Sequence, residues 1–123
     1  MYEISYHSKP TYLHAIITGD CNKVNVLGFL EEVVSKCFEL NHKKVLFEER
    51  LIGPRIETED VYRIVSGMCA KVDGFFEAVA FVDTEAESVI NTKFAESIAD
   101  RRGIPLRVFF KVEDAKKWLN SKK

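Results

Sequence analysis

The sequence predicts a single α/β domain in which helices cover a mixed β-sheet. Two patterns predict this fold class. Near the start of the chain apolar residues alternate with polar ones, as in half-buried strands. Further along, short apolar runs typical of buried strands alternate with segments in which apolar residues recur every three or four positions, as in helices. The 123 residues are 46% hydrophobic, which is enough for one sizeable core. Because no linker rich in Pro, Gly or Ser interrupts the chain, we expect one domain over residues 1–123.

The first two strands are expected to form an antiparallel hairpin. Residues 1–7 alternate Tyr2, Ile4 and Tyr6 with polar side chains, and a turn containing proline precedes a second strand over residues 12–18. So short a connection excludes a parallel pairing, which needs a crossover of about a dozen residues. The first strand is therefore expected at an edge of the sheet, where such strands are either protected or paired with another copy.

A helix and a buried strand are expected next. Asn22 or Asn25 can cap the helix, which ends near Asn41 and His42. Residues 44–48 form a short β run that carries Val45, Leu46 and Phe47 without alternation, as in a strand that is covered on both faces. The apolar face of the helix repeats at helical spacing through Val26, Leu27, Leu30, Val33, Val34, Cys37 and Leu40.

Thr58 is expected to cap a second helix. Glu59 and Asp60 then lie in its first turn, where the helix dipole favours anions. A wholly apolar strand follows over residues 78–82 and closes at Asp83. The buried stripe of the second helix consists of Val61, Ile64, Val65, Met68 and Val72.

A third helix bears Phe94, Ala95 and Ile98 and ends with two arginines and then Gly103, which suits the left-handed C-terminal position. A last strand over residues 106–110 and a short amphipathic helix over residues 113–120 complete the order ββαβαβαβα. The sequence leaves the order of the strands within the sheet open.

Charge and composition exclude several classes of function. The 18 basic and 19 acidic residues give a formal net charge of -1, so no basic excess is available to follow a nucleic-acid backbone. Residues 1–7 lack the features of a signal peptide, and the longest nearly apolar stretch, residues 75–82, is far short of the roughly 20 residues that cross a bilayer. Cys21, Cys37 and Cys69 are odd in number and widely spaced, which favours reduced thiols. We expect a cytoplasmic protein with no transmembrane segment, no cofactor and no nucleic-acid partner.

Three segments resemble the STAS domains of anti-sigma-factor antagonists, in their SpoIIAA-like branch. Residues 43–48, KKVLFE, resemble the third strand of that branch, residues 94–103, FAESIADRRG, resemble a helix with an Arg and Gly ending, and residues 108–119, VFFKVEDAKKWL, resemble its closing strand and helix. The branch is sometimes grouped with lipid-carrying SEC14-type domains. The resemblance spans nearly the whole chain and implies a SpoIIAA-like (STAS) fold. Because these segments are structural and not catalytic, it implies little about activity.

The chain departs from the STAS pattern at the phosphorylation site. Antagonists of this kind carry a phosphorylatable Ser after an Asp, at the head of the helix that follows the third strand, whereas residues 48–60 contain no such pair. Thr58 is the one hydroxyl there, and the carboxylates of Glu57, Glu59 and Asp60 around it repel both a bound phosphate and the nucleotide of a kinase. We therefore expect no phosphoswitch.

Charged residues near this helix start are candidates for ligand contacts. Arg50 and Arg55 can clamp an anion at the helix N-terminus, although their acidic neighbours favour a solvated loop with internal ion pairs. Glu48 and Asp83 fall near the carboxyl ends of parallel strands, where open sheets bind ligands. These two carboxylates are therefore candidates for polar contacts in a cleft.

Enzymatic interpretations lack an assembled set of reactive groups. Cys37 and Cys69 lie on apolar helix faces, where a thiol is inert. His7 and His14 can meet across the hairpin, but this pair has no carboxylate as a third metal ligand, so we expect no metal site.

Phe75 and Phe76 favour a binding function. Consecutive aromatic residues of an extended segment cannot both point inward, so one of them faces a partner or a pocket, or else covers the core. The sequence thus predicts a non-enzymatic regulatory or protein-interaction module, whose partner is another protein or a second copy of the chain. The alternative is a carrier or sensor of a small apolar ligand such as a lipid, held near these phenylalanines and the loop of Leu51 and Ile52. A small hydrolase or transferase ranks last.

Overall fold

The computed structural model describes residues 2–53, 57–72, 74–83 and 96–121. Residues 96–101 are helical. The remaining elements are, in chain order, β1 (Tyr2–Ser8), β2 (Leu13–Asp20), α1 (Lys23–Leu40), β3 (Lys44–Ile52), α2 (Thr58–Lys71), β4 (Ala78–Asp83), β5 (Leu106–Phe109) and α4 (Val112–Ser121). This order confirms the ββαβαβαβα pattern that the sequence predicts.

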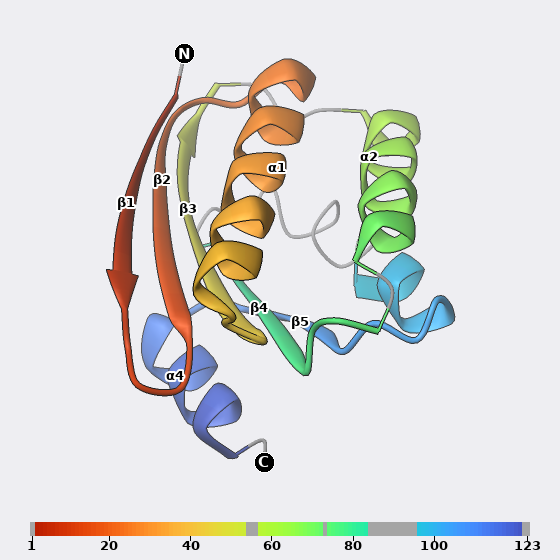
Figure 1. Ribbon diagram of the computed structural model, residues 1–123. Coiled ribbons are helices and arrows are strands. Elements are labelled where there is room, and N and C mark those ends of the chain that lie inside the picture. The colour runs from red at the N-terminus through yellow and green to blue at the C-terminus, as the bar shows by residue number, and fades with distance from the viewer. Residues whose placement is uncertain (1, 54–56, 73, 84–95, 122–123) are drawn as a thin grey trace.

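The strands form one five-stranded mixed sheet in the order β1-β2-β3-β4-β5 (Figure 1). β1 and β2 pair antiparallel, as their short connection predicts, and the other neighbours pair parallel through helical crossovers. The sheet therefore has two edges, β1 on one side and the shorter β5 on the other.

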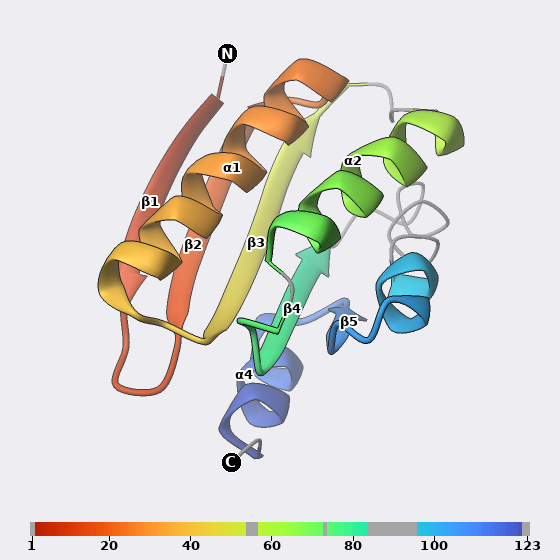
Figure 2. The ribbon, with the colours of Figure 1, turned by 45° about the vertical axis from the view of Figure 1, so that its right-hand side comes forward.

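Helices cover both faces of the sheet (Figure 2). α1 and α2 lie on one face and bury the larger core, and α4 lies on the other face over a smaller one. The larger core draws on alternate residues of each strand, because successive side chains of a strand point to opposite faces. Its fully buried members include Leu13, Ala15, Ile17, Phe29, Val33 and Val45.

A buried lysine joins the smaller layer to the sheet. Lys44 of β3 is 9% exposed, and its ammonium donates a hydrogen bond to the Leu119 carbonyl at 3.2 Å, in the last turn of α4. A cation at this place is favourable because the C-terminal carbonyls of a helix carry partial negative charge. The α4 helix is thereby held against β3 and β4.

The ends of α1 follow the sequence prediction. Asn22 is the N-cap, since its side-chain oxygen accepts a hydrogen bond from the Asn25 backbone N–H at 2.8 Å. The side-chain amide of Asn25, in the same turn, donates a hydrogen bond to the Asp20 carbonyl at 2.9 Å. Asn41 ends the helix with a left-handed φ of 56°.

Several boundaries differ from the prediction, and two of them bear on the candidate ligand contacts. The N-cap of α2 is Glu57 and not Thr58, which begins the helix, and no side-chain hydrogen bond caps this end. β3 continues past residue 48 to Ile52, because its ladder with β2 persists to the pair of Asp20 and Ile52. Glu48 therefore lies within a strand and not at its end.

The C-terminal part of the chain largely agrees with the prediction. Gly103 has a positive φ of 77° and follows the helical residues 96–101, as predicted. β5 ends at Phe109, one residue earlier than expected. Phe94 and Ala95 lie outside the described residues, and Ile98 is buried. In the described part of the chain, none of the helices is both long and apolar enough to cross a bilayer.

Candidate functional site

A polar cluster on the α4 side of the sheet joins β2 to β3. Glu48 is 8% exposed, and its two carboxylate oxygens have separate partners. The His14 ring nitrogen Nε2 lies 2.9 Å from Glu48 Oε1, and the Arg50 guanidinium reaches Oε2 at 2.8 Å from Nε and 2.5 Å from Nη2. His14 is buried as well, whereas most of the Arg50 side chain is exposed.

Electrostatics fix the charge states of this cluster. Burial raises the pKa of Glu48, but the hydrogen bonds and charges of Arg50 and His14 outweigh it, so the net pKa is lowered. Burial lowers the pKa of His14, and the opposing influence of Glu48 only partly restores it. The ionised carboxylate can only accept hydrogen bonds, so Nε2 of His14 donates.

The cluster is therefore suited to cross-linking strands. Both oxygens of Glu48 are engaged, one with a neutral imidazole and one with a guanidinium, and these bonds tie β2 to β3. The hydrogen bonds that Glu48 accepts come from His14 and Arg50, so its carboxylate is already engaged on both oxygens. Sequence reasoning missed this cluster because it depends on the register of a parallel pair.

The two predicted carboxylates do not converge. Asp83 pairs in register with Glu49, and Glu48 pairs with Val82. Since neighbouring residues of a strand point to opposite faces, the Glu48 and Asp83 side chains lie on different sides of the sheet. Asp83 is 4% exposed at the end of β4.

The predicted anion clamp cannot be assembled from the described groups. Arg50 pairs with Glu48 on the α4 side of the sheet. Arg55 lies outside the described residues, and for Thr58 only the backbone is described. An anion-binding role for Arg55 and Thr58 stays a prediction.

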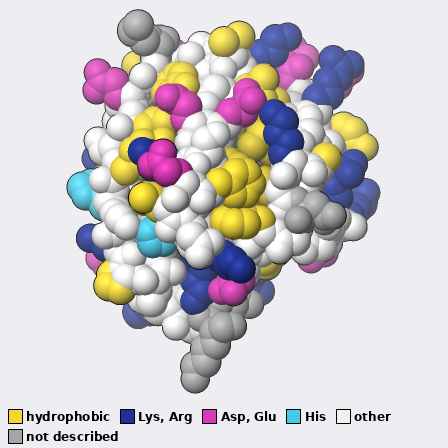
Figure 3. All heavy atoms as spheres, in the orientation of Figure 1, with side chains coloured by type: hydrophobic (Ala, Val, Ile, Leu, Met, Phe, Trp, Pro, Cys, Tyr) yellow, Lys and Arg dark blue, Asp and Glu magenta, His cyan; other side chains and the backbone are white. Residues whose placement is uncertain are grey.

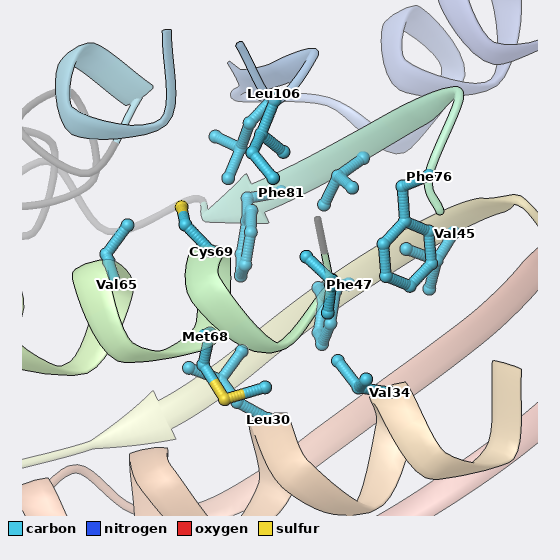
Figure 4. Close-up of a pocket in the computed structure, with 13 residues that line it drawn as sticks. Leu30, Val34, Val45, Phe47, Val65, Met68, Cys69, Phe76, Phe81 and Leu106 are labelled. Atoms are coloured by element: carbon cyan, nitrogen blue, oxygen red, sulfur yellow. The ribbon is translucent and has the colours of Figure 1, made fainter. Parts of the chain in front are cut away.

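An apolar cavity of about 60 Å³ lies between α1, α2 and the sheet (Figure 4). Phe47 and Phe81 stack in its wall with ring centroids 4.5 Å apart. Small-molecule pockets usually measure about 300–1,000 Å³, so the cavity is too small for a lipid chain. Its lining is wholly hydrophobic: Leu30, Val34, Val45, Phe47, Val65, Met68, Cys69, Val72, Phe76, Val79, Phe81, Ile104 and Leu106.

Phe75 lies in a turn before β4 and not in an extended segment, and its ring packs edge-on against that of Phe76 with centroids 5.0 Å apart. Phe76 is 9% exposed and lines the cavity. Phe75 is half-buried and packs edge-on against Phe38 of α1, with ring centroids 4.5 Å apart. Phe38 is 45% exposed, and Figure 3 shows hydrophobic side chains at the surface between α1 and α2. Leu51 is buried in the core and Ile52 is exposed.

The three cysteines are free thiols, and two of the histidines lie near one another. Cys21, Cys37 and Cys69 form no disulfide, and burial raises the pKa of Cys37 to about 12, which makes this thiol unreactive. The rings of His7 and His14 lie 6.0 Å apart across the hairpin. Among the described residues, no three side chains of His, Cys, Asp or Glu are grouped so that they can hold a metal ion.

In the described part of the chain, the outer edge of β1 is unpaired along the whole strand. β1 is seven residues long, and within the described residues it pairs only with β2, in an unbroken register from Tyr2 opposite Gly19 to Ser8 opposite Leu13. Figures 1 and 2 both show β1 as the outermost strand. On the α1 side, Tyr2 donates a hydrogen bond to Glu32 and the Tyr6 ring lies 5.5 Å from the Lys36 ammonium. On the other side, three exposed polar residues alternate with them: Glu3, Ser5 and His7.

One hydrogen bond shows which backbone groups of β1 face outward. Lys9 continues the register opposite Tyr12, and its N–H donates to the Tyr12 carbonyl at 2.9 Å. Hydrogen-bonded pairs alternate with non-bonded ones along an antiparallel ladder. His7, Ser5 and Glu3 therefore bond to β2. The residues that direct their N–H and C=O groups away from the sheet are Tyr2, Ile4, Tyr6 and Ser8.

Comparison with known proteins identifies the fold and not the activity. No protein-family model and no curated protein matches the sequence. The solved structure of an uncharacterised protein of the DUF3478 family from Shewanella loihica, which has a SpoIIAA-like fold, is similar with a TM-score of 0.55. The two chains are 14% identical, and the similarity covers 96% of this chain and 93% of that one. This chain has a SpoIIAA-like fold.

Proposed function

We propose that the chain is a non-enzymatic protein-interaction module whose partner adds a strand to the open edge of β1. The unprotected backbone of this edge carries the proposal. Strand addition supplies affinity through main-chain hydrogen bonds and specificity through alternate side chains, and the outward groups of β1 offer both.

Among the described residues, β1 has few of the features that normally prevent such pairing, and Glu3 is its one charged side chain. Natural sheets protect their edges with lysine, proline, bulges or very short strands. β1 contains neither lysine nor proline, and its register with β2 is free of bulges. The opposite edge strand, β5, has only four residues. An edge of this length without protection supports a role in binding.

The polar groups of the described part support a non-enzymatic role. The buried carboxylate of Glu48 has both oxygens occupied by His14 and Arg50, which supports a structural role for this carboxylate in joining β2 to β3. The absence of an Asp and Ser pair in residues 48–60 separates the module from the phosphoswitch of the antagonists it resembles. Regulation, in this proposal, acts through partner binding at β1.

The test compares two variants of one outward-facing residue. Ile4→Pro removes an N–H that points away from β2 and places a ring at the edge, while Ile4→Ala removes the same side chain but keeps the N–H. Each chain is immobilised, and partners from the source cells are identified by mass spectrometry. We expect partners that are retained by Ile4→Ala and lost by Ile4→Pro, with both variants shown to be folded by their thermal unfolding. Equal retention by the two variants would contradict the proposal.

A second candidate is a carrier of a small apolar ligand, favoured by the wholly hydrophobic lining of the cavity that includes Phe76. Because about 60 Å³ is too little for a lipid chain, this function requires α2 to move away from the sheet. Native mass spectrometry after incubation with palmitate tests it. A carrier gives a one-to-one adduct that Val65→Trp, by filling the cavity, abolishes. The second candidate fails if no adduct forms.

A further inference from the structure

The partner of β1 can be argued from its own residues. An exposed carboxylate and an exposed imidazole lie symmetrically about the middle of the strand: Glu3 is two residues before Ser5, and His7 is two residues after it. On the α1 side, Ile4 and Tyr6 flank Ser5 in the same way. A strand with this symmetry is complementary to a copy of itself turned by a two-fold axis.

We infer that the chain forms a homodimer in which two β1 strands pair antiparallel about a two-fold axis through Ser5, giving a continuous ten-stranded sheet. This inference rests on the proposed function and deepens it by naming the partner. Glu3 then lies opposite His7 of the second copy, so a carboxylate acceptor faces an imidazole donor. Ile4 lies opposite Tyr6, and aromatic residues pair favourably with β-branched ones across strands.

The backbone selects this register. Only the even-numbered residues of β1 direct hydrogen-bonding groups outward, so they must meet even-numbered residues of the copy. An axis at Ile4 pairs residues 2–6 alone and sets Glu3 against Ser5. An axis at Tyr6 pairs residues 4–8 alone and sets His7 against Ser5. The axis at Ser5 pairs all seven residues of the strand, and the register with the most hydrogen bonds is also the one that sets Glu3 opposite His7.

The helices leave room for this arrangement. In the dimer the two copies of α1 lie on the same side of the joined sheet, because the axis is perpendicular to it. α1 contacts both β1 and β2, so it lies between two and three strand spacings, about 10–14 Å, from its copy. Helices pack at about 8–10 Å, so the two α1 helices do not collide.

Disulfide trapping tests the register. The Cα atoms of a directly opposed non-hydrogen-bonded pair lie about 4.5 Å apart, within the range of a disulfide. We expect Ser5→Cys to cross-link to its copy on mild oxidation. A cysteine in the Glu3→Cys variant is equally exposed on the same face but should not cross-link to the same position of a second copy. When the Glu3→Cys and His7→Cys variants are mixed, the two different chains should cross-link to each other. The unsubstituted chain shows the background from the native cysteines. Equal cross-linking of Ser5→Cys and Glu3→Cys, or of neither, would overturn the inference.

Exchanging the charges tests the pairing without cysteine. Glu3→Lys sets a lysine against His7, and His7→Glu sets two glutamates together. We expect each variant to raise the dimer dissociation constant about tenfold, because each changes two symmetry-related pairs. A mixture of the two variants should form a heterodimer in which both pairs are complementary, and sedimentation velocity measures it. Two variants that dimerise as well as the original chain would contradict the register.

The two proposals fail separately. A chain that stays monomeric at every concentration and gives no Ser5→Cys cross-link overturns self-pairing. If that chain still loses a captured partner on Ile4→Pro and keeps it on Ile4→Ala, the edge binds a strand of another protein and the proposed function holds.

Discussion

Replacing Glu48 by alanine is expected to destabilise the fold by about 1–4 kcal/mol. The Glu48 carboxylate accepts a hydrogen bond from the buried His14 ring at 2.9 Å and one from Arg50 at 2.8 Å. Its removal leaves a buried donor unsatisfied, which costs about 1–3 kcal/mol. The pair with Arg50, whose side chain is mostly exposed, adds at most about 1 kcal/mol.

Two further variants make this prediction specific. Glu48→Gln keeps an acceptor oxygen for His14 and should cost only about 1 kcal/mol. Glu39→Ala also removes a glutamate from an ion pair, but the pair with Lys36 is exposed, so the loss should stay below about 0.5 kcal/mol. Urea unfolding gives the free energies. If Glu48→Ala costs no more than Glu39→Ala, the cluster does not cross-link β2 to β3 as we describe.

Three other predictions concern single side chains. Burial lowers the pKa of His14, so neutral His14 contributes its full share of the folding stability above the unfolded pKa of about 6.5, and that share is lost as the pH falls through the lower folded pKa. His14→Gln should therefore flatten the dependence of unfolding free energy on pH below about 6.5. An unchanged profile would contradict the assignment. Asn22→Ala should cost about 1 kcal/mol while Asn22→Asp, which keeps the capping acceptor, should cost little, and equal losses in thermal unfolding would exclude the cap. Phe76→Ala should cost about 3–5 kcal/mol in urea unfolding and the half-buried Phe75→Ala clearly less, so similar losses would show that Phe76 does not line the core.

Local pattern was sufficient for most of the fold. The alternation of Tyr2, Ile4 and Tyr6 predicts a half-buried strand, and the short connection after it allows only an antiparallel partner. Gly103 predicts a helix end because few other residues adopt its positive φ of 77°. Such signals lie within a few residues of the feature they specify, so a single sequence contains them.

Features that depend on register or tertiary contact were not predictable. β3 extends to Ile52 because its neighbour β2 offers a ladder to that point, which the composition of residues 49–52 does not reveal. The pairing of His14 with Glu48 needs the offset of two parallel strands. Thr58 is a better capping residue than Glu57 by propensity, yet the chain enters α2 one residue earlier.

Amide hydrogen exchange along β1, followed by NMR at increasing protein concentration, tests the central claim most directly. At low concentration the N–H groups of Ile4 and Tyr6 should exchange rapidly, while those of Ser5 and His7, bonded to β2, should be protected. At high concentration, or with a bound partner, the protection of Ile4 and Tyr6 should rise to that of their neighbours. If the Ile4 and Tyr6 amides exchange at the same rate at every concentration and with every captured partner, the edge of β1 is not an interaction surface.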